Sequence, residues 1–115
     1  MATPVPDPDG PLIPMPELTP EALRRAVTRI IPSRIHVFDE HLAEAATNAQ
    51  QLQSLAPLRT FIHIWATRVA IARHPARAAR LDHLEALIKA GDEASLAAMD
   101  EINRIHRSAE VEAGL

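Results

Sequence analysis

The 115-residue chain has no cysteine, which excludes disulfide bonds and thiolate metal sites and is compatible with a reducing compartment. Its three glycines, Gly10, Gly91 and Gly114, lie in tails or turns, so the sequence has no glycine-rich loop for nucleotide phosphates. No stretch approaches the roughly 20 apolar residues of a membrane span, and the N-terminus has no basic segment followed by an apolar run. We therefore expect a cytoplasmic protein that does not contact a membrane.

Residue patterns typical of enzymes and metal sites are also scarce. The few serines do not occupy the strained strand-to-helix turn that presents a nucleophile. Among the six histidines, His36 lies four residues before Glu40, but His41 is rotated about 100° from Glu40 on an expected helix, so a third metal ligand would have to come from elsewhere. His83 and His106 suit solvent-facing or capping positions. We expect no catalytic residues, no metal and no cofactor.

Charge is distributed unevenly along the chain. The net charge is −3, and all but one of the 12 basic residues are arginine. No acidic residue occurs between Glu44 and Asp82, yet five arginines fall in that interval: Arg59, Arg68, Arg73, Arg77 and Arg80. This concentration predicts a locally electropositive surface on a slightly acidic protein.

The arginines allow two interpretations. They can bind an anionic partner, either nucleic-acid phosphates or the acidic surface of another protein. Alternatively, about two of the five pair with acids of the chain itself, in exposed ion pairs worth about 0–1 kcal/mol each. The candidates for such internal pairing are Arg59, Arg68 and Arg80. We predict that Arg73, Arg77 and Arg80, which cluster around the His74–Pro75 break, form a contact surface.

Residues 1–18 form a proline-rich arm, in which a helix is disfavoured and strand hydrogen-bond donors are missing. We expect this arm to be extended or disordered. Its segment PLIPMP contains three large apolar residues, Leu12, Ile13 and Met15, whose exposure to water is unfavourable. They predict docking, in a polyproline-like conformation, into a groove on the chain's own core or on a partner.

Capping residues and prolines mark the first two helices. Thr19 is a suitable N-cap and Pro20 a suitable first residue for a helix that ends before Pro32. Its apolar residues recur at three-four spacing, with arginines on the opposite face. A second helix is expected over about residues 33–54, with Phe38 on its apolar stripe. Its outward-facing acids are Asp39, Glu40 and Glu44.

Three further helices are expected after residue 54. Pro57 lies in the first turn of the third, which carries the only tryptophan, Trp65, at the predicted centre of the core. The fourth begins at Pro75 and ends at Gly91. Asp92 is expected to cap the fifth helix, whose apolar residues recur every three positions: Leu96, Met99, Ile102 and Ile105.

The sequence thus predicts an all-α fold, a compact bundle of about five helices preceded by the extended arm. No segment shows the period-two alternation of a strand. The expected organisation is an arm over residues 1–18, a helical domain over residues 19–110 and a frayed tail over residues 111–115. A homodimer is a further expectation, because a core of this size is marginal if the arm does not pack.

Three segments, PLIPMPELTPEALRRAV, IIPSR and APLRTFIHIWATRVAIARHPARAARLDHLE, resemble a family of short uncharacterised helical proteins of streptomycetes and related actinobacteria. The most specific pieces are PLIPMP, the Trp65–Ala66 pair and the Arg73–His74–Pro75 corner. The resemblance covers nearly the whole chain and implies an antitoxin-like partner of a small toxin of the RelE/ParE kind. Such toxins are usually basic, so the acidic helix at Asp39–Glu44 would have to make the contact.

We interpret the chain as a non-enzymatic protein-interaction module whose partner is another protein. The predicted partner-binding residues are Leu12, Ile13, Met15, Arg73, Arg77 and Arg80. The alternative is a nucleic-acid-binding helical protein that uses the basic corner Arg73–Arg80. The negative net charge and the lack of aromatic residues among the arginines outside the core disfavour that alternative.

Overall fold

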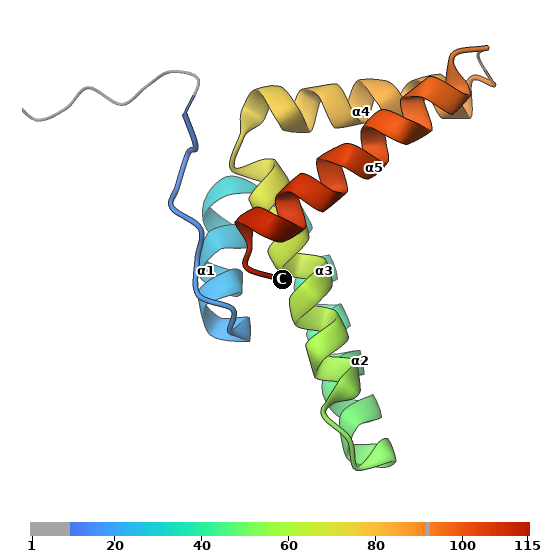
Figure 1. The fold of residues 1–115 in the computed structure, drawn as a ribbon. Helices are drawn as coiled ribbons and strands as arrows, with labels where there is room; N and C mark the ends of the chain where they lie inside the picture. Colours follow the sequence, from blue (N-terminus) through green and yellow to red (C-terminus); the bar gives the residue numbers. More distant parts are fainter. Residues whose placement is uncertain (1–9, 92) are drawn as a thin grey trace, which may run out of the picture.

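The computed structural model describes residues 10–91 and 93–115. Their helices are α1 (Pro20–Ile30), α2 (Ile35–Leu52), α3 (Ala56–Ala72), α4 (Pro75–Lys89) and α5 (Ser95–Glu112), with a 3₁₀ turn η1 (Pro32–Arg34) before α2. These residues form no strand, which confirms the predicted all-α fold of five helices. Two antiparallel pairs, α2–α3 and α4–α5, extend in different directions from the junction of α3 and α4, and α1 packs against α2 and α3 (Figure 1).

The predicted caps and breaks are confirmed at four helix ends. The Thr19 hydroxyl accepts a hydrogen bond from the Ala22 amide at 3.1 Å, and Pro20 begins α1. Proline lies in the first turn of both α3 and α4. Gly91 follows α4 at φ 67°, in the left-handed region that glycine adopts at low cost. These signals are local, which explains why the sequence alone reveals them.

The aromatic side chains meet at the centre of the core. Phe38, Phe61 and Trp65 are fully buried, and the Phe38 ring lies edge-on to each of the other two at centroid distances of 5.0 Å. The Trp65 indole N–H donates a hydrogen bond to His41 Nδ1 at 2.9 Å, so its one polar atom is satisfied. The predicted central position of Trp65 is confirmed.

The fifth helix differs most from its prediction. It begins at Ser95, and the expected cap Asp92 lies outside the described residues. Leu96 and Met99 are 80% and 50% exposed, whereas Ala98 and Ala109 are buried. A three-residue spacing rotates a stripe by about 60° at each step, so the stripe does not stay on the buried side of the helix, and its first two members are exposed.

The C-terminal residues also differ from their prediction. Residues 111–115 were expected to fray, but α5 continues through Glu112 and Ala113 is buried in the core. Hydrogen bonds continue beyond the helix end, since the Leu115 amide donates to the Glu110 carbonyl at 2.9 Å. The ordered tail therefore contributes side chains to the features described below.

Candidate functional site

The described part of the arm, residues 10–18, packs on the chain's own core. Ile13 is 7% exposed and belongs to the core, Met15 packs against it, and Leu12 is 54% exposed. The Leu12 amide donates to the Arg73 carbonyl at 2.7 Å. The PLIPMP segment was predicted to dock on the chain's own core or on a partner, and the structure shows the first of these two arrangements. Prolines 4, 6 and 8 of the arm lie outside the described residues.

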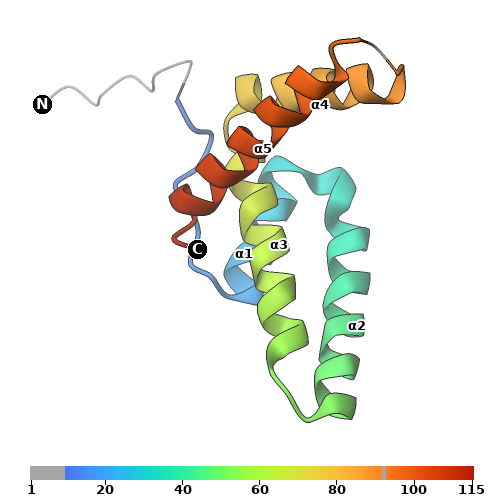
Figure 2. The same ribbon diagram turned by 45° about the vertical axis from the view of Figure 1, so that its right-hand side comes forward.

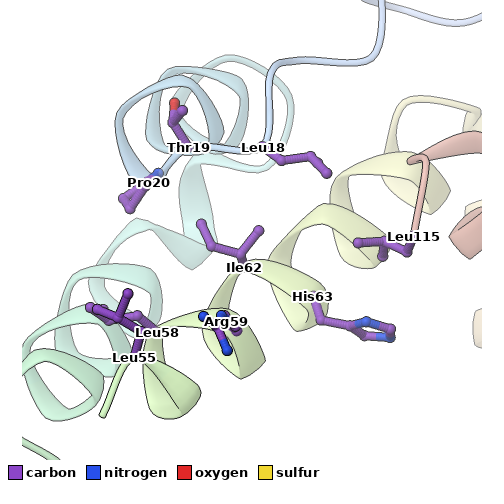
Figure 3. A pocket seen from close by; sticks show the side chains of 9 residues that line it. All are labelled: Leu18, Thr19, Pro20, Leu55, Leu58, Arg59, Ile62, His63 and Leu115. Carbon is purple, nitrogen blue, oxygen red and sulfur yellow. The ribbon is translucent and has the colours of Figure 1, made fainter. Parts of the chain in front are cut away.

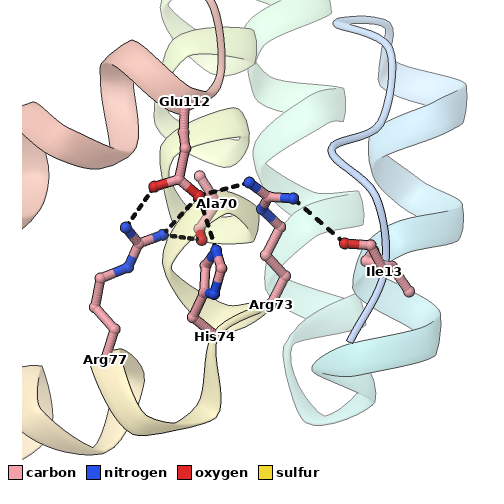
Figure 4. A network of polar contacts seen from close by, with 6 residues as sticks. All are labelled: Ile13, Ala70, Arg73, His74, Arg77 and Glu112. Atoms are coloured by element: carbon pink, nitrogen blue, oxygen red, sulfur yellow. Dashed lines mark hydrogen bonds and ion pairs between the residues drawn. The ribbon is translucent and has the colours of Figure 1, made fainter. Parts of the chain in front are cut away.

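The basic corner is an internal network centred on one carboxylate, Glu112 of α5 (Figure 4). Glu112 Oε1 accepts hydrogen bonds from Arg73 Nη2 at 2.5 Å and from His74 Nε2 at 2.9 Å, while Oε2 accepts from Arg77 Nη1 at 2.5 Å. Arg77 also donates to the Ala70 carbonyl, and Arg73 lies 3.4 Å from the Ile13 carbonyl oxygen.

This network changes the titration of its acid. Hydrogen bonds from Arg77, and then from Arg73 and His74, lower the pKa of the Glu112 carboxyl from 4.5 to about 2, although partial burial opposes the shift. The corner joins three parts of the chain, because it binds the end of α5, the start of α4 and the arm at Ile13.

Arg73, Arg77 and Arg80 were predicted to form a contact surface. The structure contradicts the expectation that their guanidinium groups are free to bind a partner. The Arg73 side chain is 10% exposed and that of Arg77 is 19% exposed, and both bind Glu112. Arg80 is more exposed and pairs with Glu101 at 2.6 Å. The reason is the length of α5, which brings Glu112 to the corner from a segment that was expected to fray.

The internal pairing predicted for Arg59, Arg68 and Arg80 is confirmed for Arg80 alone. Arg59 makes no ion pair with any described residue, and Arg68 lies over the ring of Trp65, with its guanidinium carbon 4.7 Å from the ring centroid. Of the three candidates named for pairing, only Arg80 pairs. Of the five arginines between Glu44 and Asp82, Arg59 is thus the one that has neither a carboxylate nor an aromatic partner among the described residues.

An apolar groove of about 620 Å³ lies beside Arg59, between the beginning of α1 and the first half of α3 (Figure 3). Leu58 and Ile62 are half-buried in it, and its more exposed side chains are Leu18, Leu55 and Leu115. The lining residues are Leu18, Thr19, Pro20, Leu55, Leu58, Arg59, Ile62, His63 and Leu115. None of these side chains is acidic, and Arg59 is the one permanently charged side chain among them, while His63 already lies 3.5 Å from Glu110.

Sequence reasoning missed this groove because its walls come from three separate parts of the chain. The missed signal is a difference in helix length, since α1 has 11 residues whereas α2 and α3 have 18 and 17. At about 1.5 Å per residue α1 is roughly 10 Å shorter than its two neighbours. In Figure 2, the α2–α3 pair continues beyond the beginning of α1. The groove lies where α1 begins.

A second hollow, of about 490 Å³, lies between α4 and the surface formed by η1 and α3. Arg34 and Arg68 line it from η1 and α3, and Asp82 and Glu85 line it from α4. Because cations and anions both contribute, this hollow does not favour a ligand of one sign. The apolar groove, whose one permanently charged lining side chain is Arg59, is the candidate functional site.

Metal and membrane sites receive no support from the described residues. No group of three His, Asp or Glu side chains among residues 10–91 and 93–115 could hold a metal ion. Within the same ranges, every helix is too short or too polar to cross a bilayer.

A family model matches residues 12–110 of the chain, and the chain belongs to this family, the family of unknown function DUF6247. No curated protein and no solved structure matches the chain. The family match begins within the PLIPMP segment and ends in α5, so it includes the helices that form the groove.

Proposed function

We propose that this protein is a non-enzymatic interaction module that binds an acidic amphipathic helix of a partner protein in the apolar groove. The observation that carries the proposal is the combination of five leucine and isoleucine side chains with an arginine that has no acidic partner among the described residues.

The shape of the groove favours a helix as its occupant. Two neighbouring helices that extend beyond a shorter third one leave room for a further helix in line with it, and α1 is the shorter one here (Figure 2). A helix bound in this way inserts apolar side chains at positions i, i+3 or i+4, and i+7. The volume of about 620 Å³ is large enough for several aliphatic side chains.

The charge of the groove favours acidic residues at the edge of that helix. Arg59 lies on the exposed side of α3 next to the apolar residues. His63 is on the same helix, with its Nε2 atom 3.5 Å from Glu110. A carboxylate on the partner would meet an exposed guanidinium, which favours the correct partner and its orientation more than it adds affinity.

A pair of designed peptides tests this proposal. Both peptides, of about 15 residues, carry the same leucine face of an amphipathic helix, one flanked by glutamate and the other by lysine. We expect the glutamate peptide to bind the wild-type protein at least about tenfold more tightly, by fluorescence anisotropy. Arg59→Glu should reverse that preference, and Leu55→Asp should weaken both peptides.

Leu55→Asp is suited to this test because Leu55 is the N-cap of α3, where aspartate is a favourable residue. The matched control is Val37→Asp, which introduces the same charge at a 42% exposed valine outside the groove. If the Leu55→Asp protein binds each peptide as tightly as the wild-type protein does, the groove is not the binding site.

An antitoxin-like role is a second form of interaction module, which would use the acidic surface of α2 and not the groove. A basic toxin would find exposed acids on α2, where Asp39 is engaged by two hydrogen bonds of 2.9 Å from Arg24 but Glu40 and Glu44 make no ion pair with a described residue. Co-purification with the product of the adjacent gene tests this role. We expect Glu40→Lys/Glu44→Lys to lose the complex, and retention of a wild-type-like complex would remove α2 from the contact.

Nucleic-acid binding remains the alternative from the sequence, with weaker support. The guanidinium groups of Arg73, Arg77 and Arg80 are bound by Glu112 and Glu101, so phosphates would have to displace these carboxylates. A gel-shift assay at low salt should show no retardation of duplex or single-stranded probes. Salt-sensitive binding that Arg73→Ala/Arg77→Ala/Arg80→Ala weakens would instead favour this alternative.

A further inference from the structure

We infer that a second copy of this chain can occupy the groove through the beginning of its α5, so that two copies form a reciprocal dimer. This inference rests on the proposed function of the groove and names one helix with the required chemistry. We call Glu93, Leu96, Met99 and Asp100 the α5 tip.

The α5 tip carries unpartnered apolar side chains. Leu96 is 80% exposed, the highest exposure among the large hydrophobic residues that the structure describes, and Met99 is 50% exposed. Positions 96 and 99 are three residues apart, so their side chains lie on one side of the helix. The beginning of α5 lies away from α1, α2 and α3 (Figure 1), and the exposure of Leu96 and Met99 shows that their side of the helix is open to another molecule.

The α5 tip also carries the charge that the groove lacks. Asp100 follows Met99 directly and lies four residues after Leu96, and Glu93 precedes the helix. Both acids are exposed, and neither makes an ion pair with a described residue. The tip is thus an acidic amphipathic segment, while Arg59 provides the positive charge at the groove.

The distance between tip and groove within one molecule favours exchange between two copies. Leu115 lines the groove just after the end of α5, and the α5 tip lies at the other end of this 18-residue helix. At about 1.5 Å per residue the two ends are roughly 25 Å apart, so a chain does not insert its own tip into its own groove. Two copies related by a twofold axis form two identical tip-to-groove contacts, which closes the assembly at a dimer.

Sedimentation velocity of the full chain over a concentration series tests the inference. We expect a monomer–dimer equilibrium that Leu96→Asp weakens about tenfold to hundredfold, because one buried leucine is replaced by a charge. Leu55→Asp should have a similar effect from the groove side, and Val37→Asp should have none. Leu96, Leu55 and Val37 are exposed, so their substitution should not unfold the protein. A weaker dimer would therefore not be the result of a folding defect.

Two further experiments test the geometry. A mixture of Leu96→Asp and Leu55→Asp proteins should dimerise more strongly than either alone, because the mixed dimer retains one contact between an intact tip and an intact groove. Arg59→Glu and Asp100→Arg should each weaken the dimer, and the double variant should recover it. If neither the mixture of the two aspartate variants nor the double charge-swap variant restores dimerisation, the tip-to-groove contact is overturned.

The outcomes separate this inference from the proposed function. A wild-type protein that stays monomeric at the highest accessible concentration but binds the glutamate peptide overturns the dimer and supports the groove as a partner site. A dimer that survives both Leu96→Asp and Leu55→Asp uses another surface and also overturns the inference. Continued growth beyond two copies overturns the reciprocal arrangement, because one-way contacts form open chains.

Discussion

Replacing Glu112 by glutamine removes the carboxylate that Arg73, His74 and Arg77 share at the corner between α3 and α4 (Figure 4). Glutamine keeps the size of the side chain and one acceptor oxygen but loses the charge. The Arg73 side chain is 10% exposed, so it would keep its positive charge in a mostly buried position without a compensating anion. We therefore expect Glu112→Gln to destabilise the fold.

The size of the effect follows from the titration of Glu112. Its pKa falls from 4.5 to about 2 in the folded protein, and one pKa unit corresponds to about 1.4 kcal/mol. The unscreened value would be about 3.4 kcal/mol, and the 27% exposure of the side chain reduces it through solvent screening. We expect the free energy of unfolding to fall by about 2–3 kcal/mol at pH 7.

The pH dependence has a defined sign. The pKa of Glu112 is lower in the folded than in the unfolded protein, so its contribution is complete above about pH 4.5 and is lost as the pH falls towards about 2. The wild-type protein should therefore lose the 2–3 kcal/mol over that interval. The Glu112→Gln protein should lack this part of the acid-induced destabilisation.

Urea unfolding followed by the fluorescence of Trp65 measures the effect, because this single tryptophan is fully buried in the fold. Glu101→Gln is the matched control, since Glu101 pairs with Arg80 on a more exposed surface where solvent weakens the ion pair. An unchanged unfolding midpoint in Glu112→Gln at pH 7, or the same loss in both variants, would refute the central role of the Glu112 network.

Three smaller perturbations test how the helices and the arm are held, each by urea unfolding followed by circular dichroism. Ile13→Ala should cost about 2–3 kcal/mol, because this arm residue is 7% exposed in the core; a cost near zero would mean that the arm is not docked in solution. Thr19→Ala should cost about 1 kcal/mol through loss of the N-cap hydrogen bond to Ala22, and Thr19→Ser should retain most of the stability. Gly91→Ala should cost about 1–2 kcal/mol at φ 67°, because no atom lies within 4 Å of the added methyl group and only the backbone conformation is strained; a stabilised variant would contradict that conformation.

The sequence predicted those parts of the fold that depend on neighbouring residues. Thr19, Pro20, Pro75 and Gly91 set helix ends through their own backbone preferences, so their effects are visible without a structure. The central position of Trp65 was also predictable, because the stripe of α3 is long and strongly apolar.

The sequence did not predict contacts between distant segments. Arg73 and Glu112 are 39 residues apart, and only the packing of α5 against α3 brings them together. The stripe of α5 was misjudged at Leu96 for a related reason. The first turns of α5 lie beside α4 and away from the other described helices (Figure 1), and there Ala98 is buried while the larger side chains of Leu96 and Met99 are exposed.

Predicting the groove would require both local signals in the sequence and contacts between distant segments. The positions of Pro20 and Pro32 already limit α1 to 11 residues, so a length mismatch with the following helices could be read from the sequence. The sequence does not show whether another segment covers the uncovered part of α3. The arm and the tail both reach the edge of this part, where Leu18 and Leu115 line the groove, while Leu12 is hydrogen-bonded to Arg73 and Glu112 is bound at the corner. Leu115 forms one wall of the groove, so the corner network that binds Glu112, three residues earlier, helps to place that wall.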